Sequence, residues 1–146
     1  MSRLTKPLLF ASSTECEQAF YDALERADLD AMMAVWAEDE EIVCVHPAGP
    51  RHAGYAAVQE SWRQIFSGGP RLKVRVSHQV FLHGVMLAIH SVHENISIAG
   101  EETLRPPVVA TNVYLRGTQG WRMLVHHASP SPVPPELMPE SSKTLH

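Results

Sequence analysis

Residues 42–52 read Ile-Val-Cys-Val-His-Pro-Ala-Gly-Pro-Arg-His, a short apolar run that ends in a histidine and is followed by proline and glycine. Such a run predicts a buried strand that the proline and glycine stop. The strand would deliver one titratable side chain, that of His46, to the edge of a cavity. Its imidazole exchanges a proton near neutral pH and suits a general base, but a hydrogen bond to a loop carbonyl is an equally good interpretation.

The composition limits the class of protein. With 146 residues, 45% of them hydrophobic, the chain is long enough for one domain with one core. A net charge of -4 with only 12 lysines and arginines makes nucleic acid an unsuitable partner. No apolar run approaches the roughly 18 residues of a membrane span. Cys16 and Cys44 lie within apolar patterns, so we expect free thiols and a cytoplasmic location.

The spacing of apolar residues predicts three helices. The first begins near Ser13, where Thr14 and Glu17 fit a capping box. Asp28 is placed to cap a second helix, which the acidic residues 38–41 end. The third helix follows the His46 strand and ends at the Gly-Gly-Pro of residues 68–70. The apolar positions are Cys16, Ala19, Phe20, Ala23, Leu24 and Ala27 in the first helix, Leu29, Met32, Met33 and Trp36 in the second, and Ala57, Val58, Trp62, Ile65 and Phe66 in the third.

Beyond the third helix the apolar period changes to two. Leu72, Val74 and Val76 alternate with polar residues, which predicts a strand with one solvated face. Three further strands are expected at about 84–98, 107–116 and 120–129, with a hairpin turn at 117–120. Arg51 and His52 are interpreted as solvated loop residues. We therefore predict an extension at 1–12, a folded domain at 13–129 and a proline-rich tail at 130–146.

Helices followed by long antiparallel strands predict an α+β fold, with the three helices packed on one face of a curved, mostly antiparallel sheet. The order of elements resembles the NTF2-like, SnoaL-type domains, which are cone-shaped α+β barrels. The matching segments are residues 20–24 with 28–30, residues 36–39, Gly54 with Val58, and residues 120–123 leading into 126–129. The resemblance implies a pocket between sheet and helices and a homodimer formed sheet to sheet. It specifies a fold better than a function, because this family includes isomerases, dehydratases, cyclases, carriers and assembly domains.

The ketosteroid isomerases of that family remove a proton with a carboxylate and bind the enolate oxygen with a tyrosine and a protonated aspartic acid. In this chain the resemblance places the base near His46 and Cys44, the tyrosine at Phe20 beside Tyr21, and the acid at Asn112. No acidic base and no neutral carboxylic acid are therefore expected, so classical ketosteroid isomerase activity is not predicted.

Several side chains are candidates to contact a ligand. Asn112 shares a strand face with Tyr114, and together they would present an amide and a phenol to the pocket; an Asn bonded to neighbouring strands is an equal alternative. Two registers compete along residues 84–98, and the resemblance favours the one that turns Ser91 and His93 inward, although a one-residue slip would reverse it. The candidate ligand contacts are Tyr21, Trp36, Trp62, Ser91, His93, Asn112, Tyr114 and Ser129. Trp36 and Trp62 are equally typical of a helix-to-sheet core.

Only one of the adjacent pair His126 and His127 can point into the barrel. Comparison with the last strand of the resembled family selects His127, together with Val125 and Ser129. None of the histidine spacings HxH, HxxxH or HExxH occurs, so a metal site is not predicted.

Two functions remain open after this comparison. The first is a pocket for a small apolar or weakly polar organic molecule, with His46 and His127 as base and donor of an isomerisation, dehydration or cyclisation that needs no cofactor. The second is an assembly module without catalysis. Its outer sheet face would form the homodimer through the stripe of Val109, Thr111, Val113 and Leu115.

Overall fold

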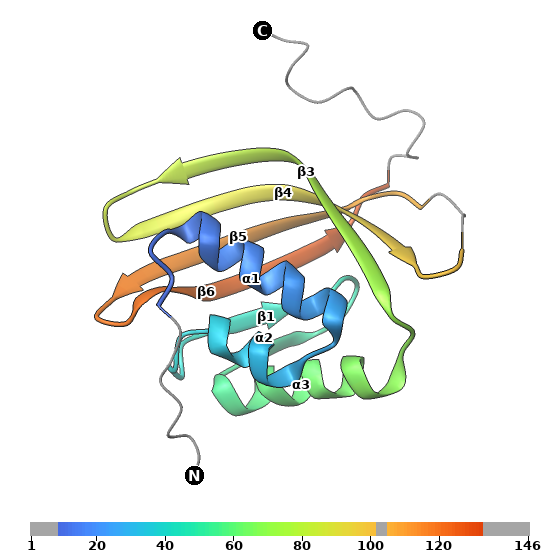
Figure 1. Ribbon diagram of the computed structural model, residues 1–146, viewed down its shortest axis with the longest axis horizontal. Helices are drawn as coiled ribbons and strands as arrows, with labels where there is room; N and C mark the ends of the chain where they lie inside the picture. The colour runs from blue at the N-terminus through green and yellow to red at the C-terminus, as the bar shows by residue number, and fades with distance from the viewer. Residues whose placement is uncertain (1–8, 102–104, 133–146) are drawn as a thin grey trace, which may run out of the picture.

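The computed structural model describes residues 9–101 and 105–132. Three helices lie on one side of a six-stranded sheet (Figure 1). The elements are α1 (Ser13–Arg26), α2 (Leu29–Val35), β1 (Val43–Val45), β2 (Arg51–Ala53), α3 (Tyr55–Gly68), β3 (Leu72–His83), β4 (Leu87–Ile98), β5 (Val108–Gly117) and β6 (Gly120–Pro130). The predicted tail at 130–146 lies mostly outside the described residues. None of the described helices is long and apolar enough to cross a membrane.

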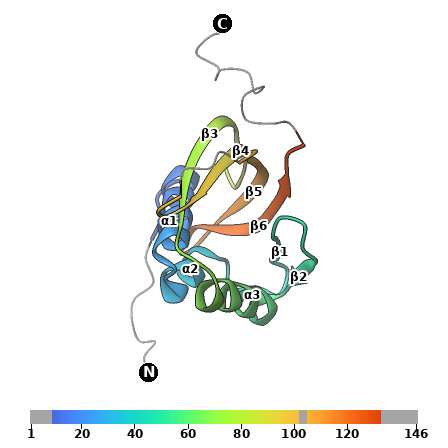
Figure 2. The same ribbon diagram turned by 90° about the vertical axis from the view of Figure 1, so that its right-hand side faces the viewer.

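The strand order is β2-β1-β6-β5-β4-β3, and every pair is antiparallel except β1 with β6. The sheet is open and curved, with α1 and α2 against its concave side and α3 beneath (Figure 2). The parallel pairing places Cys44 beside His126 and Val45 beside His127, so the end of β1 meets the middle of β6. The predicted cone-shaped α+β fold is confirmed.

Of the two predicted helix N-caps, that of α2 is confirmed and that of α1 is wrong. Asp28 caps α2 as predicted, because its side chain accepts from the backbone N–H of Ala31 at 3.0 Å. The start of α1 is different. Ser12 is its N-cap and accepts from the N–H of Glu15 at 3.0 Å, so the predicted capping box at Thr14 and Glu17 is wrong. Glu17 is therefore free to turn inward, where it is buried.

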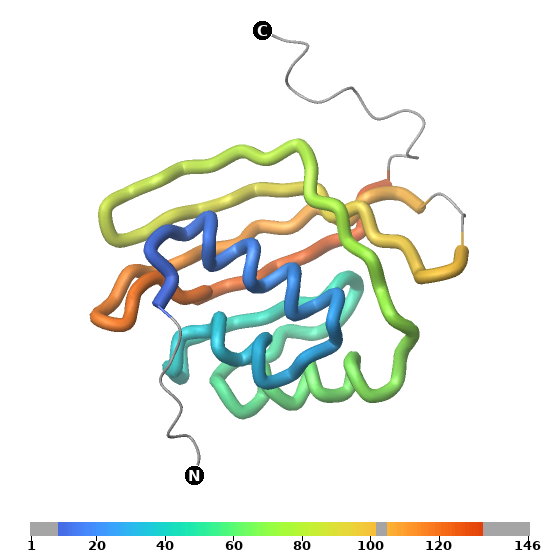
Figure 3. Tube along the Cα trace, viewed as in Figure 1, coloured from blue at the N-terminus to red at the C-terminus, as the bar shows by residue number. Residues whose placement is uncertain are grey.

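Two strand predictions are also corrected. Arg51 and His52 do not lie in a loop but pair with β1 as part of β2. Strand β3 runs on to His83, beyond the predicted alternation, because a bulge between Ser77 and Val80 restarts its pairing with β4. Figure 3 shows the sharp bend of β3 along its length.

The register prediction for β4 is wrong. Ala88, His90, Val92 and Glu94 are buried, whereas Ser91 and His93 lie on the outer face. Polar side chains of α1 face this strand and need polar partners, which the register with His90 and Glu94 inward supplies.

The prediction for β6 is wrong for a different reason. Tyr114 of β5 pairs with Met123, but its neighbour Val113 pairs with Val125, so Leu124 is an extra residue. This bulge reverses the alternation beyond it. His126 is buried, and His127 and Ser129 are exposed on the outer side.

A glycine at the start of β6 generates a testable prediction. Gly120 has φ 84°, and a Cβ there would lie 2.8 Å from the carbonyl oxygen of Phe10, which accepts from the N–H of Trp121 at 3.0 Å. Gly120→Ala should therefore lower the free energy of unfolding by about 2–4 kcal/mol, through positive φ and loss of this bridge. Gly100, at φ 90° with nothing within 4 Å, provides the control for backbone strain alone.

Gly100→Ala should cost only about 1–2 kcal/mol. Urea unfolding of both variants measures the difference. Equal losses in the two variants would show that the contact with Phe10 contributes nothing.

Candidate functional site

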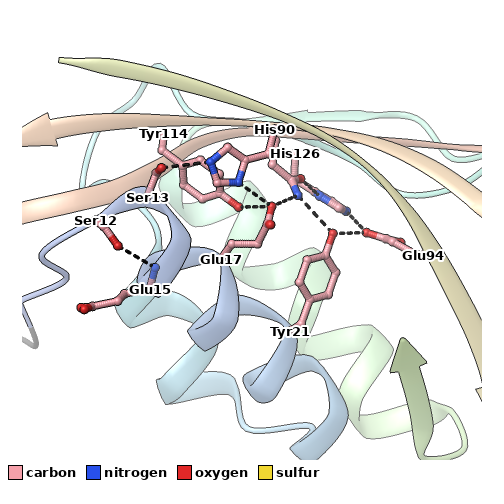
Figure 4. Close-up of polar contacts among 10 residues, drawn as sticks. Ser12, Ser13, Glu15, Glu17, Tyr21, His90, Glu94, Tyr114 and His126 are labelled. Atoms are coloured by element: carbon pink, nitrogen blue, oxygen red, sulfur yellow. Dashed lines mark hydrogen bonds and ion pairs between the residues drawn. The ribbon is translucent and has the colours of Figure 1, made fainter. Parts of the chain in front are cut away.

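A buried polar network fills the centre of the fold between α1 and the sheet (Figure 4). Its members are Ser13, Glu17 and Tyr21 of α1, His90 and Glu94 of β4, Asn112 and Tyr114 of β5, and His126 of β6. The three α1 residues are spaced by four positions, which places them on one helix face opposite the strands. The network brings together residues from four elements that are distant in the sequence.

Glu17 gathers the donors in one half of the network. Its Oε2 accepts from the amide of Asn112 at 3.0 Å and from the hydroxyl of Tyr114 at 2.9 Å. His90 Nδ1 lies 3.1 Å from the same oxygen without forming a hydrogen bond to it, so we treat the pair as an electrostatic contact. The other ring nitrogen of His90 is 2.9 Å from the hydroxyl of Ser13.

Asn112 determines how the other half of the network is protonated. Its Nδ2 donates to Glu17 and, at 3.1 Å, to the hydroxyl oxygen of Tyr21. Its Oδ1 is 2.6 Å from Nδ1 of His126. Because Oδ1 can only accept, His126 must carry its proton on Nδ1. The Nε2 atom of His126 is therefore an acceptor.

Glu94 is the carboxyl group whose ionisation the fold perturbs most clearly. Tyr21 donates its hydroxyl proton to Oε2 of Glu94 at 2.6 Å. Burial raises the pKa of Glu94 to about 7, the charge of Glu17 adds to this rise, and the Tyr21 hydrogen bond opposes it. Burial also lowers the pKa of His126 to about 3, with His46 and His127 adding to the effect. At neutral pH, Glu94 is therefore poised between its two forms while His126 is neutral.

His46 lies directly after β1 and is half-buried. Its Nε2 is 3.0 Å from Oγ of Ser61, whose own proton goes to the carbonyl of Val58 at 2.7 Å. His46 must therefore donate from Nε2, and its Nδ1 is left as an acceptor. Burial, followed by the nearby His52, lowers the pKa of His46 to about 4, so this imidazole is also neutral at neutral pH.

Trp62 of α3 joins His46 to the network. Its ring meets that of His46 edge-on at 4.6 Å between centroids and lies 6.2 Å from that of His126. We call His46, Ser61, Trp62, Glu94 and His126 the His46 end of the interior. It combines a half-exposed imidazole with a fully buried acid.

The structure sorts the predicted ligand contacts into two groups. Tyr21, Asn112 and Tyr114 lie in the network; the last two share one face of β5, as the alternation predicts, and that face points inward. Trp36 and Trp62 are buried in the core. The candidates outside the interior are Ser91, His93, His127 and Ser129.

Sequence reasoning missed five network members: Ser13, Glu17, His90, Glu94 and His126. The positions compared with the ketosteroid isomerases hold no acid, but Glu94 brings a carboxyl group into the interior from β4, and burial raises its pKa to about 7. The sequence did contain a signal for the network: Ser13, Glu17 and Tyr21 are spaced four residues apart, among the apolar residues of α1. Polar residues on the buried stripe of an amphipathic helix need buried partners.

The expected ligand-sized pocket is not confirmed. The network side chains are themselves buried and occupy the centre of the fold. A hollow of about 20 Å³, enough for one water molecule, lies elsewhere, at the ends of α1 and α3. It is lined by Leu24, Ala27, Ile65, Phe66, Gly69, Pro70, Arg71 and Leu72. Within residues 9–101 and 105–132, no group of three or more histidine, cysteine or acidic side chains is arranged to hold a metal ion.

The raised pKa of Glu94 predicts a pH-dependent stability. Because burial raises the pKa of Glu94 to about 7, the folded state keeps the proton up to about that pH, while the unfolded chain releases it near the ordinary pKa of 4.5. The stabilising contribution is therefore complete below pH 4.5 and lost as pH rises through 7, a change of about 3 kcal/mol. Glu94→Gln keeps an acceptor for Tyr21 but cannot titrate.

Urea unfolding at pH 5 and pH 8 tests this. The stability of Glu94→Gln relative to the unmodified protein should rise by about 2–3 kcal/mol between the two pH values. Comparison with the unmodified protein removes the shared loss at acidic pH from His46 and His126, whose pKa values are lowered. The exposed acid Glu38 provides the control Glu38→Gln. Parallel pH profiles of Glu94→Gln and the unmodified protein would contradict the buried titration.

Comparisons with known proteins agree on the family. A family model for the SnoaL-like domain matches residues 14–134. A solved structure from Thiobacillus denitrificans, whose name refers to a calcium/calmodulin-dependent protein kinase type II association domain, is 41% identical with a TM-score of 0.80 and covers 84% of this chain and 98% of its own. A protein from Streptomyces avermitilis, named as a dehydratase of the NTF2-like family, is 27% identical with a TM-score of 0.76 and covers 84% and 95%.

A curated plant protein also matches. F-box protein SKIP8 of Arabidopsis thaliana is 24% identical over 112 residues, which cover 75% of this chain and 46% of SKIP8. The chain thus spans less than half of that relative's length. Together with the observed fold, the family match places this chain in the SnoaL-like domain family of the NTF2-like superfamily.

Proposed function

We propose that this protein binds a small organic molecule at the His46 end of its interior and transfers a proton on it without a cofactor. The reaction class is an isomerisation, dehydration or cyclisation next to a carbonyl group, which needs only a base and a hydrogen-bond donor. The observation that carries the proposal is the buried carboxyl of Glu94, held by Tyr21 and poised to titrate near neutral pH. Perturbed acids of this kind are concentrated at functional sites.

Glu94 is the proposed base. A catalytic base is most effective when its pKa lies near the working pH, and Glu94 meets this condition through burial. Tyr21 is the proposed donor to the negative charge that develops on the carbonyl oxygen, because its hydroxyl proton, held by the Glu94 carboxylate at rest, can turn to that oxygen as Glu94 takes up the substrate proton. His46, neutral and half-exposed, is the proposed second proton carrier between the site and solvent. His127 has no place in this mechanism, because it is exposed on the outer side.

The walls of the His46 end favour a ligand with an apolar body. Trp62 packs against Phe66 at 5.5 Å and Phe20 at 5.7 Å between ring centroids. Ligand entry requires the partly buried side chains at this end, such as His46 and Phe66, to move aside. The dehydratase named among the similar structures supports a reaction of this class.

Proton exchange tests the proposed reaction directly. The protein is incubated in D₂O with a panel of ketones and hydroxyketones, and NMR follows deuterium entry next to the carbonyl. Glu94→Gln and His46→Ala should each lower the exchange rate by about 10²- to 10⁴-fold, the usual contribution of acid-base catalysis. Glu38→Gln should exchange at the unmodified rate. An undiminished rate in Glu94→Gln would refute the assignment of the base.

A second function, homodimeric assembly through the outer sheet face, is favoured by a separate observation. Large apolar side chains are exposed on and beside this face, including Leu82 at 67% and Leu115 at 38%. Leu82 pairs with Ile89, Ile89 with Val113 and Val113 with Val125, so an apolar row crosses four strands. The similar protein whose name refers to an association domain is consistent with this role.

The assembly proposal predicts a change of mass. Leu82→Glu and Leu115→Glu should convert a dimer to a monomer at micromolar concentration, because each buries a charge in the contact. Light scattering coupled to size exclusion measures the mass. Gln59→Glu, on the exposed side of α3 and away from the outer sheet face, is the control and should remain dimeric. An unmodified protein that is monomeric would refute this function.

A further inference from the structure

Two hydrogen-bond acceptors face each other at the His46 end. His126 Nε2 lies 3.9 Å from Oε2 of Glu94, which already accepts from Tyr21, and no hydrogen bond is found between these two atoms. Above about pH 7 the carboxyl group is ionised, so a lone pair confronts a negative charge. Such a pair is unfavourable in a buried site unless a donor bridges it.

The network prevents His126 from placing its proton on Nε2, where it could donate to Glu94. Moving its proton to Nε2 would place a bare Nδ1 against Oδ1 of Asn112 at 2.6 Å. Turning the Asn112 amide would break its donations to Glu17 and Tyr21. The acceptor face of His126 is therefore imposed by three neighbours and is part of the site.

The charged side chains of the interior also favour a ligand that brings donors and positive charge. The buried polar and charged side chains are Ser13, Glu17, Ser61, His90, Glu94, Asn112 and His126, which include two acids and, among the described residues, no lysine or arginine. His46 adds a third acceptor, its Nδ1, against the same Trp62 ring. The site is thus rich in acceptors and low in positive charge.

We propose that the ligand of this site is a small organic cation, a primary amine in its protonated form, whose ammonium lies between Glu94 and His126. This inference rests on the ligand-binding part of the proposed function and not on its proton transfer, because an ammonium paired with Glu94 occupies the carboxylate that would act as the base. An ammonium group brings three donors and a positive charge, whereas a hydroxyl group brings one donor and a carboxylate none. Coulomb attraction to Glu94 and Glu17 is strong in a buried setting.

The surrounding side chains suit the rest of such a ligand. The aromatic rings of Phe20, Trp62 and Phe66 pack together beside the acceptors and favour both an apolar body and a cation. The indole N–H of Trp62 is buried and has no partner among the described residues. It can donate to an oxygen elsewhere in the ligand.

Three probes of similar size separate the possibilities: benzylamine, benzyl alcohol and benzoate, titrated by calorimetry at pH 7.5. Benzylamine should bind at least tenfold more tightly than benzyl alcohol, and benzoate should not bind. Glu94→Gln should lose this tenfold preference and bind benzylamine no more tightly than benzyl alcohol. The exposed control Glu38→Gln should retain the preference.

A second measurement uses only the unmodified protein. At pH 7 the ammonium should displace the proton from Glu94, so titrations in buffers with different ionisation enthalpies should detect proton release with benzylamine and none with benzyl alcohol. The other titratable groups that face Glu94 are Tyr21 and Glu17 of α1, His126 of β6 and Cys44 of β1. Release that persists in Glu94→Gln would assign the proton to another of these groups and overturn the inference.

The outcomes distinguish the amine inference from the proposed ligand-binding function on which it rests. Equal binding of benzylamine and benzyl alcohol overturns the amine and leaves a ligand site. Tighter binding of benzoate overturns the amine as well. Binding of none of the probes, together with undiminished proton exchange in Glu94→Gln, overturns both proposals.

Discussion

The side chain of Asn112 is the constraint on which the interior depends. Its amide donates to Glu17 and to Tyr21 on α1, and its carbonyl accepts from His126 on β6. One strand residue thereby ties the first helix to the last strand and determines which atoms of three other side chains can donate. A buried polar network is stable only when its members satisfy one another, so this arrangement tolerates few alternatives.

The irregularities of the sheet follow from this network. His126 must face inward to meet Asn112, and the bulge at Leu124 turns it inward while Met123 also stays buried. Likewise His90 and Glu94 of β4 face inward because Ser13, Glu17 and Tyr21 of α1 require partners. The hydrophobic core encloses this polar centre, so the register of the strands is specified by hydrogen bonding as well as by apolar burial.

Periodicity in the sequence was sufficient for the elements and insufficient for the site. Apolar spacing predicted the three helices and the four long strands, and alternation in β5 placed Asn112 and Tyr114 on one strand face, which the structure turns inward. It could not resolve β4, where each face carries both apolar and polar residues and a one-residue slip exchanges them. It could not detect the extra residue at Leu124, because a bulge depends on the partner strand. Glu17 was assigned to a cap because Ser12 was not recognised as the true one.

The free-energy cost of burying the polar network distinguishes the two proposed functions. Burying Glu94 makes its ionised form unfavourable, and apolar side chains of similar volume would stabilise such a core at least as well. Assembly through the outer face needs the apolar row from Leu82 to Val125 and gains nothing from a titratable acid on the opposite side of the sheet. A dimerisation module could therefore dispense with the network, whereas a proton-transfer site could not. The interior chemistry thus favours ligand binding as the role of the fold, and the outer face is free to assemble the same molecule.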